Sequence, residues 1–248
     1  ARFKAIYASE YAWRQSLQAP GEDRPADSTA TLPDVGPQIQ AAKLARWTRV
    51  MAQLTAIDPR MLTSAARIDY AVYRWQIESL LAEQRYRDYE KPLNSDTSFW
   101  GDVLEWSRGS FRSEADYRNY IAMLREQPRY FAQQIDNMRA GLRRGFTPSA
   151  VTLEGRDIGV AQVVEATSAM DSPYYAPFTT MPPIIPAATQ AMLKREAQAA
   201  IRDAVVPAHK QLLTFLRGEY IPGARTTLAA DDLPDGKAYY QSKIREFT

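Results

Sequence analysis

The chain has 248 residues, and its 45% hydrophobic and 24% charged residues are the proportions of a globular protein that can bury a sizeable core. Its 31 basic and 29 acidic residues leave a net charge of +2, which argues against nucleic acid as the main partner. A single histidine, His209, and the absence of cysteine exclude Cys-His nucleophilic sites and leave no set of imidazole and thiolate ligands for zinc. No apolar run approaches the roughly 20 residues that cross a membrane as a helix, so we expect no membrane-spanning segment.

Helical periodicity dominates the first third of the chain. A loose apolar stripe runs over residues 2–18, and residues 19–36, rich in proline and glycine, are predicted to form a surface loop. Pro37 is expected at the first position of a helix, because the apolar residues after it recur at spacings of three and four. Ser64 is predicted to cap a long helix with apolar residues on two neighbouring faces, so we expect this helix to be buried on two sides.

The helical pattern is interrupted at residues 90–99 and then resumes. Ser113 begins a sequence typical of a capping box, which predicts the start of a further helix. Pro128 is expected to begin a separate helix, and Gly145 is placed to end it. Short connections of this kind favour antiparallel neighbours.

The last third holds the most unusual segment and the longest predicted helix. Residues 171–186 contain five prolines but are too apolar for a disordered linker, so we expect an ordered loop packed on the helices. The longest helix is predicted over residues 187–220 with a kink at Pro207, and a last helix over residues 235–247. No stretch alternates long enough to predict a strand, so the fold class is all-α, a multi-helix bundle.

Candidate chemistry is sparse in this chain. His209 follows Pro207 beside core positions, and we interpret it as a structural histidine. No HExxH, P-loop, GxGxxG or nucleophile-elbow spacing is present. Tyrosine is in surplus, with fourteen copies, and its ring and hydroxyl suit a peptide or ligand cleft as well as helix packing.

Two irregular segments, residues 92–100 and 172–182, are predicted to wall a substrate cleft, because functional residues concentrate on loops held by a rigid scaffold. The alternative is that these side chains only fasten the loops to the core. The candidate substrate-binding residues are Asn94, Tyr175, Phe178, Tyr239 and Tyr240.

An ordered series of phrases spans nearly the whole chain and resembles the N-terminal half of the bacterial domain-of-unknown-function family 885. The phrases are LPDVGP at 32–37, AIDPRMLTSAARIDYAVYRWQIE at 56–78, YEKPLN at 89–94, the P-x-Y-F to GLRRGFTPS run at 128–149, SPYYAPF at 172–178, VVPAHKQLLTFLRGEYIPGAR at 205–225 and LPDGKAYYQSKIREFT at 233–248.

This resemblance implies a larger helical fold similar to zinc metallopeptidases of the gluzincin type, with a deep cleft. In that family the HExxH-like zinc motif belongs to the C-terminal half, and no residue of this chain matches it. The resemblance therefore implies no catalytic or metal-binding residue here, and zinc in the missing C-terminal half. It also implies a periplasmic or other extracytoplasmic location, although the absence of cysteine suits the cytoplasm equally.

Residues 1–248 are thus expected to form a single helical domain or half-domain that lacks the catalytic half. We expect it to form one wall of the cleft of a zinc-dependent peptidase-like protein, with the complementary C-terminal half, a peptide substrate or a second copy of the chain as partners. The alternative is a stand-alone helical binding or scaffold module without enzymatic activity. A reading frame that continues past Thr248 into a histidine-bearing helix would distinguish the two.

Overall fold

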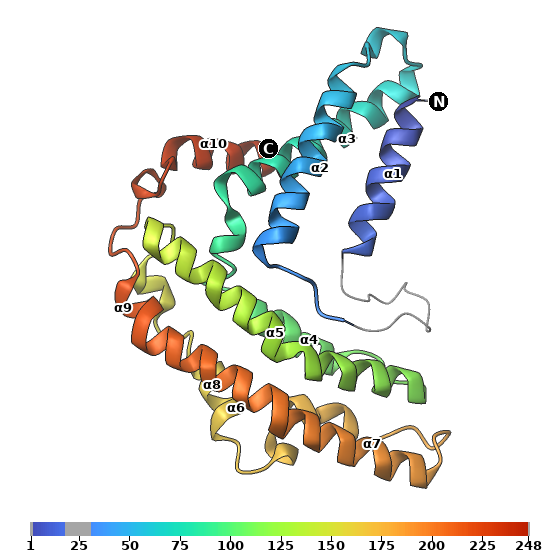
Figure 1. Ribbon diagram of the computed structural model, residues 1–248, viewed down its shortest axis with the longest axis vertical. Helices are drawn as coiled ribbons and strands as arrows, with labels where there is room; N and C mark the ends of the chain where they lie inside the picture. The colour runs from blue at the N-terminus through green and yellow to red at the C-terminus, as the bar shows by residue number, and fades with distance from the viewer. Residues whose placement is uncertain (1, 18–30, 248) are drawn as a thin grey trace. The chain divides into compact units, whose positions relative to one another are not determined.

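A computed structural model describes residues 2–17 and 31–247 of the chain, so most of the loop predicted over residues 19–36 lies outside the described residues (Figure 1). Within these ranges every regular element is a helix, apart from one isolated antiparallel bridge between Leu93 and Ser98. The predicted all-α class is confirmed.

The chain divides into two compact units. Unit 1 takes its residues from Ala1–Gln18, Asp34–Tyr89 and Leu228–Thr248, and unit 2 from Ala19–Pro33 and Glu90–Thr227. The expectation that residues 1–248 form a single domain or half-domain stays a prediction.

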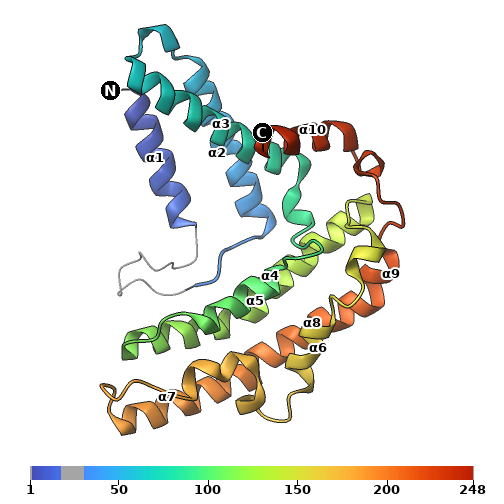
Figure 2. The same ribbon diagram turned by 180° about the vertical axis from the view of Figure 1, so that it is seen from behind.

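Unit 1 contains four helices among its described residues: α1 (Arg2–Ser16), α2 (Pro37–Thr55), α3 (Ser64–Tyr86) and α10 (Gly236–Phe247). Helices α2 and α3 run side by side, and α1 packs on both (Figures 1 and 2). Pro37 begins α2 as predicted, whereas the cap of α3 is Thr63 rather than Ser64, since the Thr63 hydroxyl accepts a hydrogen bond from the Ala66 N–H. The core of this unit contains Ile6, Trp47, Val50, Leu54, Tyr70, Tyr73, Ile77 and Leu81.

The expectation that α3 is buried on two sides is wrong. Ile68, Val72 and Trp75 form a stripe along the helix and are 66%, 61% and 46% exposed. Helices α1 and α2 pack instead on the side that carries Tyr73 and Ile77, which are both buried. Periodicity identified both apolar faces, but on the second face only Trp75 has a partner shown within the described part of unit 1, since its indole N–H donates to the Arg245 carbonyl of α10 at 3.0 Å.

Unit 2 contains the remaining helices of the described residues. They are α4 (Phe99–Glu105), α5 (Glu114–Arg144), α6 (Ile158–Glu165), α7 (Ala187–Ala200), α8 (Val206–Phe215) and α9 (Ile221–Gly223). Helix α5 lies alongside α7 and α8, and α6 packs on α8 (Figures 1 and 2). Short 3₁₀ segments connect many of the helices among the described residues, at Pro59–Met61, Asp88–Glu90, Trp106–Arg108, Ala150–Leu153, Ala169–Asp171, Pro173–Phe178 and Ala230–Asp232.

Helix α5 is bounded as the sequence predicts but is not divided at Pro128. The capping box at Ser113 is present, and Gly145 ends the helix with a φ of 75°. Pro128 lies inside the helix, which contradicts the predicted break. An internal proline costs about 3 kcal/mol, and burial of neighbours such as Leu124 and Phe131, each worth roughly 1.5–3 kcal/mol, offsets that cost.

The long helix predicted over residues 187–220 is continuous but widens twice into π-helical turns. The first, η7 (Ile201–Val205), ends two residues before Pro207, and the second, η8 (Leu216–Tyr220), ends two residues before Pro222. A proline ring clashes with the carbonyl four residues earlier in a regular α-helix, and a wider turn relieves this clash. A π-helical turn thus precedes Pro207, and the kink expected there stays a prediction.

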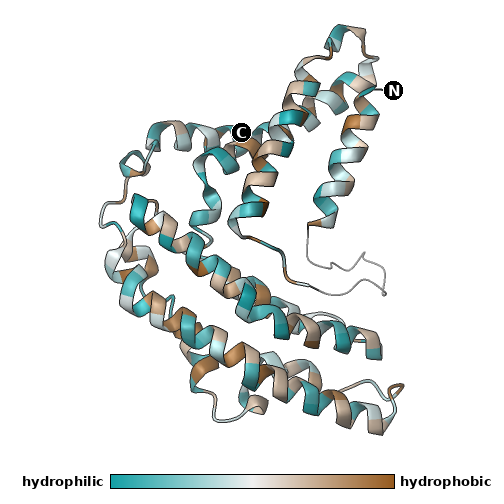
Figure 3. Cartoon of the chain, in the orientation of Figure 1, coloured by the Kyte–Doolittle hydropathy of each residue, from teal (hydrophilic) through white to brown (hydrophobic). Residues whose placement is uncertain are grey.

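Polar and apolar residues are interspersed along each helix (Figure 3), as expected for helices with one buried and one exposed face. Among residues 2–17 and 31–247, no helix has both the length and the apolar character needed to cross a membrane.

Candidate functional sites

The single histidine belongs to the core of unit 2. His209 is 1% exposed, and its Nδ1 lies 2.9 Å from the Val205 carbonyl oxygen, which can only accept a hydrogen bond. Nδ1 is therefore the donor, and Nε2 accepts from the Tyr174 hydroxyl at 3.2 Å. Burial lowers the pKa of His209 to about 4, so the ring is neutral near pH 7. The structural interpretation of His209 is confirmed.

The described residues hold no group of three or more histidine, cysteine, aspartate or glutamate side chains that could bind a metal ion. Both ring nitrogens of His209 already have partners within the core. This chain's described residues therefore do not fit a zinc site.

A groove of about 580 Å³ opens in unit 2 between residues 107–111 and the proline-rich loop. The loop is ordered, as predicted, and packs on α5 through hydrogen bonds from Tyr117 to the Pro177 carbonyl (3.2 Å) and from Tyr120 to the Tyr174 carbonyl (3.0 Å). The lining of the groove is mainly apolar and includes Phe111, Tyr117, Pro177, Met181, Pro182 and Pro183, with Ser107, Arg108 and Thr180 as polar members.

Two predicted site residues belong to the same loop but lie beneath its surface. Tyr175 is 6% exposed and Phe178 is fully buried, and their rings stack with centroids 5.5 Å apart. Phe178 also packs against Tyr117, with ring centroids 5.2 Å apart. Their neighbours Ala176 and Pro177 line the groove. Tyr175 and Phe178 therefore support one of its walls.

Asn94 is also in unit 2, where its exposed side chain closes a local turn. Its Oδ1 accepts hydrogen bonds from the backbone N–H groups of Asp96 and Thr97, each at 2.7 Å. The other irregular segment predicted to wall a cleft thus contains a self-contained turn. A role for Asn94 in substrate binding stays a prediction.

Tyr239 and Tyr240 lie on α10 in unit 1 and differ in exposure. Tyr239 is buried against Tyr86, with ring centroids 5.5 Å apart, and burial together with nearby Asp88 raises its pKa above the ordinary value. Tyr240 is 53% exposed. Of the two, Tyr240 has the hydroxyl that a ligand can reach, and its role in substrate binding stays a prediction.

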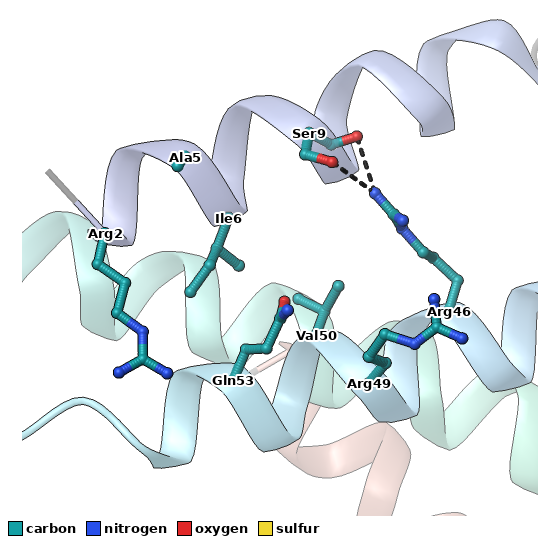
Figure 4. A pocket seen from close by; sticks show the side chains of 8 residues that line it. All are labelled: Arg2, Ala5, Ile6, Ser9, Arg46, Arg49, Val50 and Gln53. Atoms are coloured by element: carbon teal, nitrogen blue, oxygen red, sulfur yellow. Dashed lines mark hydrogen bonds between the residues drawn. The ribbon is translucent and has the colours of Figure 1, made fainter.

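A second cavity, which the sequence analysis did not predict, lies between α1 and α2 in unit 1 (Figure 4). Its volume is about 320 Å³. We call it the arginine pocket, and its lining residues are Arg2, Ala5, Ile6, Ser9, Arg46, Arg49, Val50 and Gln53. The sequence signal that could have predicted this pocket is the scarcity of acidic residues in these helices, because Glu10 is the only acidic residue of α1 and α2.

Glu10 does not line the arginine pocket, because a buried hydrogen-bond network holds its side chain in the core. Its carboxylate is fully buried and accepts hydrogen bonds from Trp47 Nε1 (3.0 Å), from the Tyr73 hydroxyl (2.9 Å) and from Arg14 Nε (3.0 Å). Arg14 also donates to Gln76 Oε1 at 3.2 Å. These contacts join α1 to α2 and α3, so the only carboxylate of the two pocket helices serves the core.

Comparison with known proteins gives a family and a fold. The family model described as bacterial protein of unknown function (DUF885) matches residues 18–248. A crystal structure titled as the putative lipoprotein from Colwellia psychrerythraea is similar over 89% of this chain, with a TM-score of 0.70 and 16% sequence identity. The match covers 39% of that protein's chain, and an identity this low supports similarity of fold alone. No curated protein matches the chain. The chain belongs to the DUF885 family of bacterial proteins of unknown function.

Proposed function

We propose that this chain is the helical, peptide-binding part of a zinc-dependent, peptidase-like protein whose metal-binding residues lie outside these 248 residues. The groove of unit 2 is the observation that carries the proposal. Aromatic and proline side chains line it, and such surfaces suit the side chains of an extended peptide. The stand-alone binding module remains the alternative function.

The polar members of the groove are suited to orient a peptide. The Thr180 side chain is exposed, and its hydroxyl can donate to or accept from a peptide backbone. Arg108 is paired with Glu105 at 2.6 Å, but their side chains are 69% and 59% exposed, so this ion pair is weak and can be exchanged for a substrate carboxylate.

The zinc in this proposal rests on the family resemblance and belongs to the remainder of the protein. A bound zinc ion would polarise a peptide carbonyl and activate water. The residues of this chain would contribute by binding and orienting the peptide, and His209 would remain a core residue because both of its ring nitrogens are engaged.

We propose the exposed stripe of α3 as the contact for the remainder of the protein. Ile68 and Val72 present neighbouring exposed apolar side chains beside Trp75, whose indole N–H already donates to the Arg245 carbonyl of α10, and contiguous apolar patches on a surface mark interaction sites. The 39% coverage of the similar structure supports a partner within the same polypeptide rather than a second copy of this chain. A location outside the cytoplasm is part of the same proposal and is supported by the lipoprotein title of that structure.

Peptide binding to the chain is the first test. A fluorescein-labelled hexapeptide of alanine and phenylalanine is titrated and compared with a serine–glycine hexapeptide. Phe111→Ala should weaken binding of the apolar peptide by about tenfold, because an aromatic anchor contributes more than 1 kcal/mol. Val151→Ala, which removes an exposed apolar side chain of unit 2 outside the groove lining, is the matched control and should leave affinity unchanged.

Equal binding of the two hexapeptides, or equal losses in the two variants, would contradict peptide recognition by the groove. Phe111 also packs on Tyr117 and Tyr120, so the melting temperature of each variant is measured in parallel. Peptide binding by the chain without metal-dependent hydrolysis by the longer protein would favour the stand-alone binding module.

A further inference from the structure

We propose that the arginine pocket of unit 1 binds the phosphate group of a phosphate ester. Two antiparallel helix faces form this pocket, with residues 2, 5, 6 and 9 of α1 opposite residues 46, 49, 50 and 53 of α2 (Figure 4). Within each face the spacing of three and four places the four residues on one side of the helix. The pocket is therefore built by the packing of the two helices.

Basic residues strongly outnumber acidic residues in these two helices. Helices α1 and α2 together carry six Lys or Arg residues and one acidic residue, whereas the whole chain has a net charge of +2. The acidic residue, Glu10, is buried and bound to Arg14, Trp47 and Tyr73. Lys43 lies near Glu83 and Asp34, which partly offset the lowering of its pKa by burial.

The cations that line the pocket have no carboxylate partner among residues 2–17 and 31–247. Arg2, Arg46 and Arg49 form none of the ion pairs found there. Arg46 and Arg49 lie one turn apart on α2 near Ser9, whereas Arg2 lies at the other end of the pocket (Figure 4). The pocket is thus lined by cations without a carboxylate, and a bound anion would supply the missing negative charge.

Arg46 is the residue best prepared to receive an anion. Its Nη2 donates to the backbone carbonyl and to the hydroxyl of Ser9, at 3.1 and 2.7 Å, and its guanidinium lies 5.7 Å from the centre of the Trp13 ring. These contacts fix the side chain at one end of the pocket (Figure 4). Its Nε is buried and has no hydrogen-bond partner among the described residues. A buried donor of this kind is destabilising unless an acceptor reaches it.

The donor set favours a phosphate over a carboxylate. A guanidinium matches two oxygens of a phosphate with its planar fork, and the two guanidinium groups of Arg46 and Arg49 offer more donors than the two oxygens of one carboxylate can use. A phosphate monoester also carries up to two negative charges. The volume of the pocket and its apolar members Ala5, Ile6 and Val50 leave space for the organic part of an ester.

Glycerol 3-phosphate and phosphatidic acid carry a phosphate monoester in a soluble and in a membrane-bound form. The chain is titrated with glycerol 3-phosphate by calorimetry and sedimented with phosphatidylcholine vesicles that contain or lack phosphatidic acid. Binding to either phosphate source supports the pocket, and the two arms identify which source is preferred. Binding should weaken as salt concentration rises. Binding to neither source would overturn the proposal.

The matched variants separate a specific pocket from general attraction to positive charge. Arg46→Gln/Arg49→Gln removes two cations from the pocket and should weaken binding by at least about tenfold. Lys4→Gln/Arg67→Gln removes two exposed cations of unit 1 outside the pocket lining and should change affinity by less than about twofold, because exposed charges at a distance are screened. Equal losses in the two double variants would overturn the proposal.

Gln53→Glu provides a second variant that retains every arginine. The new carboxylate would compete with the ligand for the pocket cations and should abolish binding, while the exposed position allows the chain to fold. Unchanged binding by Gln53→Glu would contradict the assignment of the ligand to this pocket.

Discussion

The buried Glu10 network makes a sharp prediction about the stability of unit 1. Glu10→Ala would leave the Trp47 indole N–H and the Tyr73 hydroxyl without an acceptor, and each buried unsatisfied donor costs about 1–3 kcal/mol. It would also leave the Arg14 guanidinium, whose side chain is only 18% exposed, without its carboxylate. We expect a loss of roughly 3–5 kcal/mol in the free energy of unfolding of unit 1, the usual cost of breaking a buried ion pair.

This loss is large against the roughly 5–15 kcal/mol that stabilises a typical domain. Urea unfolding followed by tryptophan fluorescence measures this loss, because Trp47 belongs to the network and the Trp13 ring packs against the Trp47 ring, with centroids 6.0 Å apart. Glu78→Ala is the matched control. It removes an exposed carboxylate of the same unit, 2.9 Å from Arg74, and should cost less than about 1 kcal/mol.

A loss below about 1 kcal/mol for Glu10→Ala would refute the reasoning, since the two donors would then have found other acceptors. Equal losses for Glu10→Ala and Glu78→Ala would refute it as well. The loss in free energy of unfolding for Glu10→Gln should lie between those for Glu10→Ala and Glu78→Ala, because the amide keeps one acceptor oxygen and the shape of the side chain.

Four further predictions concern unit 2 and α10. Burial lowers the folded-state pKa of His209 to about 4, below the unfolded value near 6.5. The contribution of neutral His209 to the free energy of unfolding is therefore complete above about pH 6.5 and falls by about 3 kcal/mol as the pH drops toward 4. Urea unfolding of His209→Asn at about pH 7 and at about pH 4 should lack this component. Pro128→Ala should stabilise the chain by about 1–2 kcal/mol in urea unfolding, because the new N–H can bond the Leu124 carbonyl, and a destabilised variant would contradict this. Tyr240→Phe in the longer protein should reduce peptide turnover without lowering the melting temperature, and unchanged kinetics would remove Tyr240 from the site. Asn94→Ala should lower the free energy of unfolding by about 1 kcal/mol, because its turn is lost.

Local signals in the sequence predicted much of the fold. The capping box at Ser113, the stop at Gly145 and the helix start at Pro37 all depend on neighbouring residues, and the structure contains each of them. The core position of His209 could be predicted because apolar residues surround it on the helix. Features set by a few adjacent residues are therefore readable from the sequence alone.

Features that depend on tertiary packing were not predictable in this way. Pro128 lies within α5 because buried neighbours offset its cost, and no local pattern reports that balance. The second apolar face of α3 was assigned to the core, but the described residues of unit 1 leave Ile68 and Val72 exposed. Periodicity identifies an apolar face without identifying its partner.

The two cavities illustrate the same limit for the candidate sites. The sequence directed attention to the proline-rich loop, and that loop does line a groove, but through Pro177 and Met181 rather than through Tyr175 and Phe178. The arginine pocket was missed because its cations come from two helices about 40 residues apart, which only antiparallel packing brings together. No spacing within either helix corresponds to a known phosphate motif.

The most direct test of the account is the metal content of the protein, measured together with chelator-sensitive peptide hydrolysis, for this chain and for a protein that continues past Thr248. We predict stoichiometric zinc and metal-dependent hydrolysis in the longer protein, and neither in the 248-residue chain after dialysis, because its one histidine is buried with both ring nitrogens engaged. Stoichiometric zinc with chelator-sensitive turnover in the chain alone, or a longer protein that lacks both, would contradict the account.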